Sequence, residues 1–336
     1  MDRGTSGEFT HDEVLAEAPR ILPAEARPEP GSIAILPEGS EFADGVAVRE
    51  AGGVVAPLSD ATRGLIYTTT RDVDTLVRTL DAHPGIGWVQ LPFAGIDAYG
   101  KALIPAAERG VLFTSAKGSY AQPVAEHALT LTLATLRQLP MRLRATSWGE
   151  SSGQSLYGAN VVVVGAGGIA LEYLRLLESF GARTTVVRRR SVPVAAADLT
   201  VTTDELDVVL PEADVVMLAA ASTDETRALI DASRLASMKP SAVLVNIARG
   251  KLVDTDALVA ALDAGMIFGA GLDVTDPEPL PAGHPLYSHE RCVVTPHTAD
   301  TPEMVQPLLE QRIRDNVRAF LETGEFVGVA DPRLGY

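Results

Sequence analysis

One stretch near the middle of the chain, residues 161–170, most constrains what this sequence can fold into. Its four consecutive valines, Val161–Val164, are typical of a strand that is buried on both faces, as in a parallel sheet. A glycine-rich turn follows, and apolar residues at helical spacing then predict a helix over Leu171–Phe180, with Gly181 as a candidate C-terminal cap. Strand, turn and helix together predict the first half of a β-α-β unit.

The turn itself has the form G-x-G-x-x-A, which is typical of dinucleotide-binding proteins. Gly165 permits the tight turn, Gly167 lets the backbone approach a pyrophosphate, and Ala170 allows close packing of helix on strand. The alternative is a glycine-rich turn with no ligand, and the flanking strand and helix weigh against it. Because a helix N-terminus offers free N–H groups to phosphates, we predict cofactor contacts here. The predicted contacts are Gly165, Gly167, Gly168 and Ile169.

The residue that closes the second strand of the unit, Arg183–Val187, indicates which dinucleotide is bound. An acidic residue there would bind the ribose 2′-hydroxyl of NAD. The chain instead continues Arg188-Arg189-Arg190, and arginine is suited to bidentate recognition of a 2′-phosphate. The alternative is a basic turn that faces solvent. Since the protein is otherwise acidic and the run lies where the fold needs a ribose partner, Arg188 and Arg189 predict NADP, with NAD as the second choice.

Composition and charge exclude several classes of protein. The 336 residues suit two domains, and a net charge of −16 repels polyanions, so we predict no nucleic-acid partner. Cys292 is the single cysteine, which excludes an intramolecular disulfide and a thiol cluster, and we predict no metal. No secretory signal or membrane-spanning apolar segment is found, so we expect a cytoplasmic protein without a membrane partner.

Beyond an N-terminal tail, the chain alternates between strand and helix patterns, as in parallel α/β sheets. Residues 1–31 are rich in Glu, Asp, Pro and Ala and predict a mobile or loosely docked acidic tail, with a candidate short helix at Asp12–Ala18. The predicted strands are 33–36, 54–55, 64–67, 87–91, 111–114, 161–164, 183–187, 215–218, 243–246, 269–274 and 292–295. The predicted helices are 42–51, 73–82, 121–139, one within 226–238, 254–264, and one within 301–322 that Pro307 kinks or restarts.

A turn at the carboxyl end of the predicted strand 87–91 is the candidate ligand site of the N-terminal half. Ligands of open α/β sheets bind at such ends. The backbone N–H groups of Phe93, Ala94 and Gly95 can hold a carboxylate there. A plain β–α turn explains the spacing equally well.

Three ionisable residues, Arg249, Glu278 and His297, follow predicted strands of the second half. His297 titrates near neutrality and can exchange the proton of a carbonyl/hydroxyl couple, while Glu278 can raise its pKa and orient it. Arg249 can pair with a substrate carboxylate, and Asp273 can accept a hydrogen bond from the nicotinamide carboxamide. Each residue alone also fits a surface loop. Together, beside a dinucleotide-binding unit, they predict reduction of a small keto acid.

These residues lie in motifs that resemble the D-isomer-specific 2-hydroxyacid dehydrogenase family, over nearly all of the chain from Ser32 onward. The segments are Phe93–Asp97, Val124–His127, Trp148, Gly165–Ala170, Asp224–Arg227, Asn246–Gly250, Gly271–Val274, Glu278–Leu280, Thr295–His297 and Asp331–Tyr336. The resemblance implies Arg249, Glu278 and His297 as the catalytic triad, and Ile247 and Ala248 are further predicted cofactor contacts.

The resemblance also implies an architecture of two Rossmann-like, doubly wound parallel-sheet domains. The cofactor domain, 118–299, is inserted in a discontinuous flavodoxin-like substrate domain, 32–117 plus 300–336, and two copies pair through the cofactor domains. Arg188 in place of the usual acid resembles the glyoxylate/hydroxypyruvate reductases of the family. Since the sequence ends at Tyr336, we expect no regulatory extension of the kind found in long phosphoglycerate dehydrogenases.

We therefore predict an NAD(P)H-dependent reductase that converts a small 2-keto acid, of the glyoxylate or hydroxypyruvate type, to the D-2-hydroxy acid. The competing hypothesis is a non-catalytic, dinucleotide-sensing binding protein, like the transcriptional corepressors that share this fold. A keto-acid turnover assay separates the two.

Overall fold

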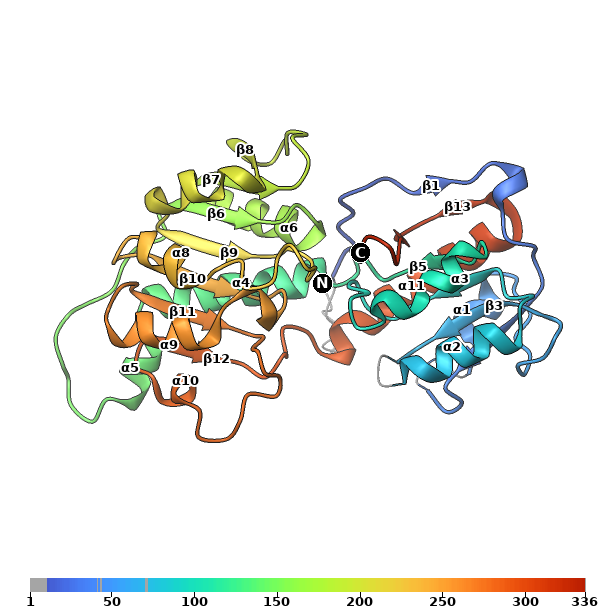
Figure 1. Cartoon of the computed structure of the whole chain (residues 1–336), viewed down its shortest axis with the longest axis horizontal. Coiled ribbons are helices and arrows are strands. Elements are labelled where there is room, and N and C mark those ends of the chain that lie inside the picture. Colours follow the sequence, from blue (N-terminus) through green and yellow to red (C-terminus); the bar gives the residue numbers. More distant parts are fainter. Residues whose placement is uncertain (1–10, 41, 43, 70–71, 336) are drawn as a thin grey trace, which may run out of the picture. The chain divides into compact units, whose positions relative to one another are not determined.

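The computed structural model describes residues 11–40, 42, 44–69 and 72–335, which form two compact units (Figure 1). Unit 1 contains the described residues up to Tyr120 and those from Pro302 onward, and unit 2 contains Ala121–Thr301. The chain therefore leaves unit 1 once and returns to it once. The sequence places the corresponding boundaries at 117/118 and 299/300.

Unit 2 is built on a seven-stranded sheet whose order is β12-β11-β10-β9-β6-β7-β8, with every neighbouring pair parallel. Its strands are β6 (Asn160–Val164), β7 (Arg183–Arg188), β8 (Leu199–Thr202), β9 (Val215–Leu218), β10 (Val243–Asn246), β11 (Gly269–Leu272) and β12 (Cys292–Val294). This is the order of a doubly wound dinucleotide-binding sheet, and it reverses between β6 and β9. Ligands of such sheets bind beyond the carboxyl ends of the strands at that reversal.

Helices cover this sheet so that its strands are buried. The four valines of β6 are each at most 3% exposed, which confirms a strand buried on both faces. The helices of unit 2 are α4 (Ala121–Leu136), α5 (Leu139–Arg144), α6 (Gly168–Leu177), α7 (Leu206–Val209), α8 (Ala232–Ser237), α9 (Thr255–Asp263) and α10 (Pro285–Ser288). The apolar helix α4 packs against α6, β10 and β11, so it lies between layers, and it ends three residues before the predicted Leu139.

Unit 1 contains a five-stranded sheet in the order β14-β5-β4-β3-β2. Its strands are β2 (Ser32–Leu36), β3 (Thr62–Tyr67), β4 (Trp88–Gln90), β5 (Leu112–Thr114) and β14 (Val329–Ala330). The predicted strand 54–55 is only an isolated bridge from Val55 to Ile33, on the free side of β2. With that bridge the order is flavodoxin-like, 2-1-3-4-5. The sheet is not wholly parallel, because β14 joins its edge antiparallel to β5.

The helices of unit 1 are α1 (Val46–Glu50), α2 (Val73–Ala82), α3 (Ile104–Glu108) and α11 (Pro302–Arg318). Helix α1 begins four residues later than predicted, after Gly45 at φ +62°, a left-handed conformation that glycine favours. Pro307 does not restart α11, which runs through it to a π-helical turn at Ala319–Thr323. Trp88 of β4 stacks on Phe320 of that turn at 5.1 Å, which anchors the returning helix to the sheet.

The prediction of a loosely docked tail is wrong for residues that the structure describes. Strand β1 (Arg20–Ile21) pairs antiparallel with β13 (Glu325–Phe326), and Glu13 forms an ion pair with the buried Arg312. The candidate helix at Asp12–Ala18 is not formed. Residues 1–10 of the predicted tail lie outside the described residues. Among the helices described, none is long and apolar enough to cross a membrane.

Candidate active site

The glycine turn after β6 has the backbone geometry that the sequence predicts. Gly165 has φ +116°, and a Cβ at this position would lie 2.5 Å from the carbonyl oxygen of Ala219. Only glycine fits this turn, because a side chain would collide with backbone. At Gly167 a Cβ would meet no atom within 4 Å, so the backbone there is open to a ligand. Helix α6 begins at the next residue, and its first N–H groups therefore face the same opening.

The predicted helix after this turn starts three residues earlier than expected, at Gly168 rather than Leu171. Ala170 is fully buried, so the small residue at the third position of the motif lies in the packed interface. The hydroxyl of Tyr173 on α6 contacts the hydroxyl of Thr132 on α4 at 2.8 Å. This buried hydrogen bond and the small Ala170 fix α6, and with it the N–H groups at its start.

Arg188 is the last residue of β7, which ends one residue later than the predicted Val187, and Arg189 and Arg190 follow it in the exposed turn. The half-buried Arg188 donates from Nη1 to the carbonyl oxygen of Val192 at 3.3 Å, which holds its side chain against the turn. Since β6 and β7 are parallel neighbours, Arg188 and the glycine turn lie at the same edge of the sheet. This edge is where a dinucleotide's adenosine ribose is bound in doubly wound sheets.

The three predicted catalytic residues follow three adjacent strands of the same sheet. Arg249 comes after β10, Glu278 after β11 and His297 after β12, and these strands are neighbours in the order β12-β11-β10. Their carboxyl ends therefore meet at one edge. His297 and Glu278 are in direct contact, with 2.6 Å between Nδ1 and Oε1. The positive charge of Arg249 acts on the pKa of both residues. The structure thus brings this predicted triad together.

The contact between His297 and Glu278 changes the pKa of both groups. The hydrogen bond to Glu278 raises the pKa of His297, against the opposing effects of partial burial and of Arg249. The same hydrogen bond lowers the pKa of Glu278. Glu278 is therefore ionised throughout the range in which His297 titrates, and the imidazolium form persists to higher pH than in a free histidine.

Replacing Glu278 by glutamine is expected to shift the pH dependence of reduction to lower pH. Reduction needs a protonated imidazole, and the raised pKa extends this form above the usual value of roughly 6.5. Glutamine keeps the shape and removes the charge, so the rate at neutral pH should fall more than the rate at pH about 5.5. The measurement is kcat/KM for keto-acid reduction against pH. If the pH profiles of the wild type and of Glu278→Gln coincide, His297 and Glu278 are not the acid–base unit.

Backbone geometry holds His297 in place at the cost of strain. Its φ of +52° is a left-handed conformation that residues other than glycine rarely adopt. Its N–H donates to the carbonyl oxygen of Asp273 at 2.8 Å, which ties the strained residue to the end of β11. The orientation of the imidazole is therefore fixed from both its backbone and its Nδ1.

Asp273 directly follows β11 and is almost fully buried, and it binds several residues of the loop that carries His297. Its carboxylate accepts hydrogen bonds from the Thr295 hydroxyl at 2.6 Å, from the Thr298 N–H at 2.9 Å and from the Ala299 N–H at 3.2 Å. Burial favours a higher pKa for Asp273, but these bonds and that from His127 outweigh it, and the pKa lies below its usual value. Asp273 thus holds the His297 loop, in addition to any role toward the cofactor.

His127 is a site residue to which sequence reasoning assigned no role beyond membership of a motif. Its Nε2 lies 2.9 Å from Thr295 Oγ1 and 3.4 Å from Asp273 Oδ1. A histidine on a helix as rich in apolar residues as α4 was the signal that could have indicated a buried polar partner. Asp300, whose pKa is raised by burial, is a second ionisable group near His297 that the sequence did not single out.

The Arg249 loop is fixed by a close approach of two backbones. A Cβ at Gly250 would lie 1.9 Å from the carbonyl carbon of Thr275, so the loops after β10 and β11 pack directly on each other. The buried Asn246 side chain donates to the carbonyl oxygen of Arg249 at 2.9 Å and accepts from the N–H of Ala248 at 3.1 Å. The main chain from Ile247 to Arg249 is therefore held rigidly at the end of β10.

The predicted substrate loop, Phe93–Gly95, lies in unit 1, whereas the triad and the glycine turn lie in unit 2. Among the residues described, none accepts a hydrogen bond from the backbone N–H groups of Phe93, Ala94 and Gly95. Three consecutive N–H groups without a protein acceptor at a strand's carboxyl end are the arrangement that a carboxylate requires.

Comparison with known proteins gives consistent results. Residues 128–299 match the family model described as D-isomer specific 2-hydroxyacid dehydrogenase, NAD binding domain. A Corynebacterium melassecola protein, described as an uncharacterized protein in the proB 3′ region, is 41% identical over 73% of this chain and 82% of its own length. A glyoxylate reductase of Thermococcus kodakarensis is 34% identical over 77% of this chain and 83% of its own. A D-isomer specific 2-hydroxyacid dehydrogenase of Xanthobacter autotrophicus, solved with NADPH and MES, superposes with a TM-score of 0.77 at 26% identity, over 91% of this chain and all of that one.

Proposed function

Because the chain belongs to the D-isomer specific 2-hydroxyacid dehydrogenase family, we propose that it reduces a small 2-keto acid of the glyoxylate or hydroxypyruvate type to the D-2-hydroxy acid. The observation that carries this proposal is the 2.6 Å contact between His297 and Glu278 beside the Arg249 loop. A proton donor with a raised pKa next to a cationic side chain suits an anionic substrate whose carbonyl must be protonated.

The glycine turn and the edge of the sheet fit a nicotinamide dinucleotide. Gly165, Gly167, Gly168 and Ile169 would hold the pyrophosphate, since the backbone at Gly167 is open and the start of α6 points its N–H groups there. Ile247, Ala248 and Asp273 would lie against the nicotinamide, at the ends of β10 and β11. When bound, the cofactor supplies the hydride.

The side chains of the triad have separate tasks in this proposal. Since Nδ1 of His297 is bonded to Glu278, Nε2 is the atom that donates a proton to the substrate's carbonyl oxygen. The guanidinium of Arg249 pairs with the substrate carboxylate and polarises the neighbouring carbonyl. In unit 1, the N–H groups of Phe93–Gly95 are the proposed carboxylate-binding donors.

A keto-acid panel tests the proposal directly. Oxidation of NADPH and NADH is followed with glyoxylate, hydroxypyruvate, pyruvate and phenylpyruvate, and we expect the two smallest polar acids, glyoxylate and hydroxypyruvate, to give the highest kcat/KM. Turnover of none of the four, by protein that binds the dinucleotide, would favour the non-catalytic sensor instead.

NADP preference is the second part of the proposal, and Arg188 and Arg189 are its basis. We expect kcat/KM to be higher with NADPH than with NADH. Replacing both arginines by alanine should weaken NADPH binding about tenfold or more, because each charge-assisted contact contributes roughly 1.5–3 kcal/mol. NADH binding should change little. Dissociation constants for both cofactors provide the measurement, and an equal loss for both would contradict the assignment.

We also infer that two copies associate through unit 2. Leu143, at 84% exposed, and Trp148, at 99% exposed, lie at and beyond α5, where two such large apolar side chains call for a partner surface. Arg144 of the same helix donates to the carbonyl oxygens of Tyr287 and His289, which fixes α5 on the unit. Sedimentation of the wild type and of Trp148→Glu tests this inference, with a dimer expected only for the wild type.

A further inference from the structure

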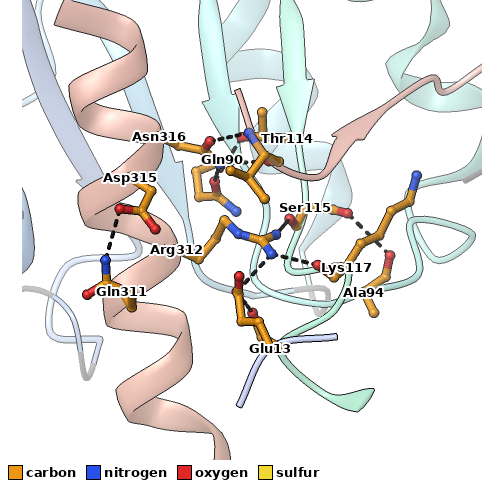
Figure 2. A network of polar contacts seen from close by, with 12 residues as sticks. Glu13, Gln90, Ala94, Thr114, Ser115, Lys117, Gln311, Arg312, Asp315 and Asn316 are labelled. Carbon is orange, nitrogen blue, oxygen red and sulfur yellow. Dashed lines mark hydrogen bonds and ion pairs between the residues drawn. The ribbon is translucent and has the colours of Figure 1, made fainter. Parts of the chain in front are cut away.

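Glu13, near the N-terminus, forms an ion pair with an arginine that is fully buried in unit 1. Arg312 of α11 has no exposed surface, and its Nη2 lies 2.8 Å from Glu13 Oε1 (Figure 2). The hydroxyl of Ser119 donates to the same carboxylate oxygen at 2.7 Å. Glu13 itself is only 19% exposed. The N-terminal segment, whose composition resembles that of disordered chains, thus contributes a counterion to a buried arginine. The two residues are 299 positions apart in the sequence.

The guanidinium of Arg312 holds the segment that follows β5. Its Nη1 donates to the carbonyl oxygen of Ser115, and its Nη2 donates to that of Lys117 at 2.6 Å (Figure 2). The N–H of Val14 donates to the carbonyl oxygen of Gly118 at 3.2 Å. A Cβ at Gly118 would lie 2.7 Å from the Leu15 side chain. The N-terminal segment is therefore packed directly on residues 115–119.

The segment 115–120 in turn supports the predicted substrate loop. The N–H of Ala116 donates to the carbonyl oxygen of Phe93 at 3.1 Å, and the Ser115 hydroxyl donates to that of Ala94 at 3.3 Å. The Tyr120 hydroxyl donates to the carbonyl oxygen of Pro92 at 3.0 Å. The carbonyl groups of the loop are thus bound from one side, and its N–H groups are left for a ligand.

Removing the Glu13 carboxylate would disturb this chain of contacts at its start. A buried guanidinium without a counterion is strongly disfavoured, so it must move toward solvent or admit water. Nε of Arg312 has no hydrogen-bond partner among the described residues, and after the loss of Glu13 only the charge of Asp315, which is not hydrogen-bonded to the guanidinium, would still favour it. Either response would release the carbonyl groups of Ser115 and Lys117.

We propose that Glu13 is a positioning residue for the Phe93–Gly95 loop, acting through Arg312 and the segment 115–120. The inference rests on the proposed function, because it assigns substrate binding to that loop. Glu13 touches neither substrate nor cofactor. Its effect should therefore appear in the KM for the keto acid rather than in cofactor affinity or in the protonation of His297.

The test compares Glu13→Ala with Glu25→Ala, which removes an exposed glutamate from the same N-terminal segment. We expect Glu13→Ala to raise the KM for the best keto acid of the panel about tenfold or more, the effect of misplacing a binding group by a fraction of an ångström. The dissociation constant of the cofactor and the pH profile should not change. Sodium formate can occupy the vacated carboxylate position, so it should lower the KM of Glu13→Ala. In the wild type and in Glu25→Ala, formate should act only as a competitor of the substrate.

Amide hydrogen exchange gives a readout that does not depend on activity. In Glu13→Ala we expect faster exchange in both residues 115–120 and residues 92–97, and no change in either for Glu25→Ala. Faster exchange in 115–120 alone, or an unchanged KM, would overturn the inference while leaving the proposed function intact. No turnover by the wild type with any keto acid would overturn both.

If Glu13→Ala does not fold, Glu13→Gln provides the test instead. Glutamine keeps the shape and the hydrogen-bond acceptor of Glu13 but not its charge. It should show the same changes to a smaller degree. If neither variant folds, Glu13 is a residue required for stability, and the positioning role is overturned.

Discussion

Replacing His297 by alanine is expected to lower the rate of keto-acid reduction about 10²–10⁴-fold at every pH, because no side chain remains to donate the proton. Among the described residues, His297 is the imidazole that the structure pairs with Glu278, at 2.6 Å, and holds by its backbone to Asp273. The left-handed φ of His297 further indicates that the surrounding structure imposes this orientation. Among the groups named in the site, His297 is the imidazole that follows β12 and has a raised pKa.

The measurement is kcat/KM across pH for His297→Ala, with cofactor affinity determined separately. His83→Ala is a suitable control, because His83 pairs with Asp60 in unit 1 and has no part in the proposed chemistry. Cofactor affinity should be unchanged in both variants. A His297→Ala variant that binds cofactor normally and retains most of its rate would remove His297 from the mechanism.

The sequence was most informative where a local pattern determines structure. The four valines of β6 and the glycine turn that follows them predicted a buried strand and a dinucleotide-binding motif, and the structure confirms the strand and the turn's geometry. Helix α2 has the predicted bounds, Val73–Ala82, because the Asp72 carboxylate caps its first turn by accepting a hydrogen bond from the Thr75 N–H. Such signals are contained within a few residues.

The elements that the sequence missed depend on distant partners. Strand β8 (Leu-Thr-Val-Thr) lies at the edge of its sheet and has only one buried residue, Val201, so it lacks the apolar run that marked β6. Strands β1, β13 and β14 have two residues each, too few for any periodicity. The acidic N-terminal segment was predicted to be loosely docked because its composition resembles that of disordered chains. Its docking depends on Arg312, which no local pattern links to Glu13.

The same distinction applies to the candidate site. Arg249, Glu278 and His297 could be predicted because each follows a recognisable strand and carries a side chain with obvious chemistry. The roles of Asp273 and His127 as mutual partners could not, because they depend on the distance between α4 and the ends of β11 and β12. Sequence patterns can place residues at strand ends. The contacts that these residues make with other elements, such as helix α4, depend on how the elements pack.

Replacing Arg249 by alanine is expected to cost about 2–5 kcal/mol in transition-state binding, or roughly 30- to 5,000-fold in kcat/KM. The loss is large because, under the proposed function, the substrate's carboxylate would be left near Glu278 without its counterion. The Arg249 loop is rigid, since Gly250 packs on the Thr275 backbone and Asn246 bonds both sides of the loop.

Arg249→Lys separates the charge of this residue from its geometry. Lysine keeps the charge but lacks the planar guanidinium. If Arg249 binds the carboxylate in a bidentate manner, we expect kcat/KM of Arg249→Lys to fall substantially as well. Addition of free guanidine should partly restore the rate of Arg249→Ala and should not affect Lys251→Ala, a control from the same loop. Arg249 also lowers the pKa of the neighbouring Glu278 and opposes protonation of His297, so its removal should raise the His297 pKa and extend reduction to higher pH. Near-normal turnover by Arg249→Ala would show that another group carries the substrate's charge.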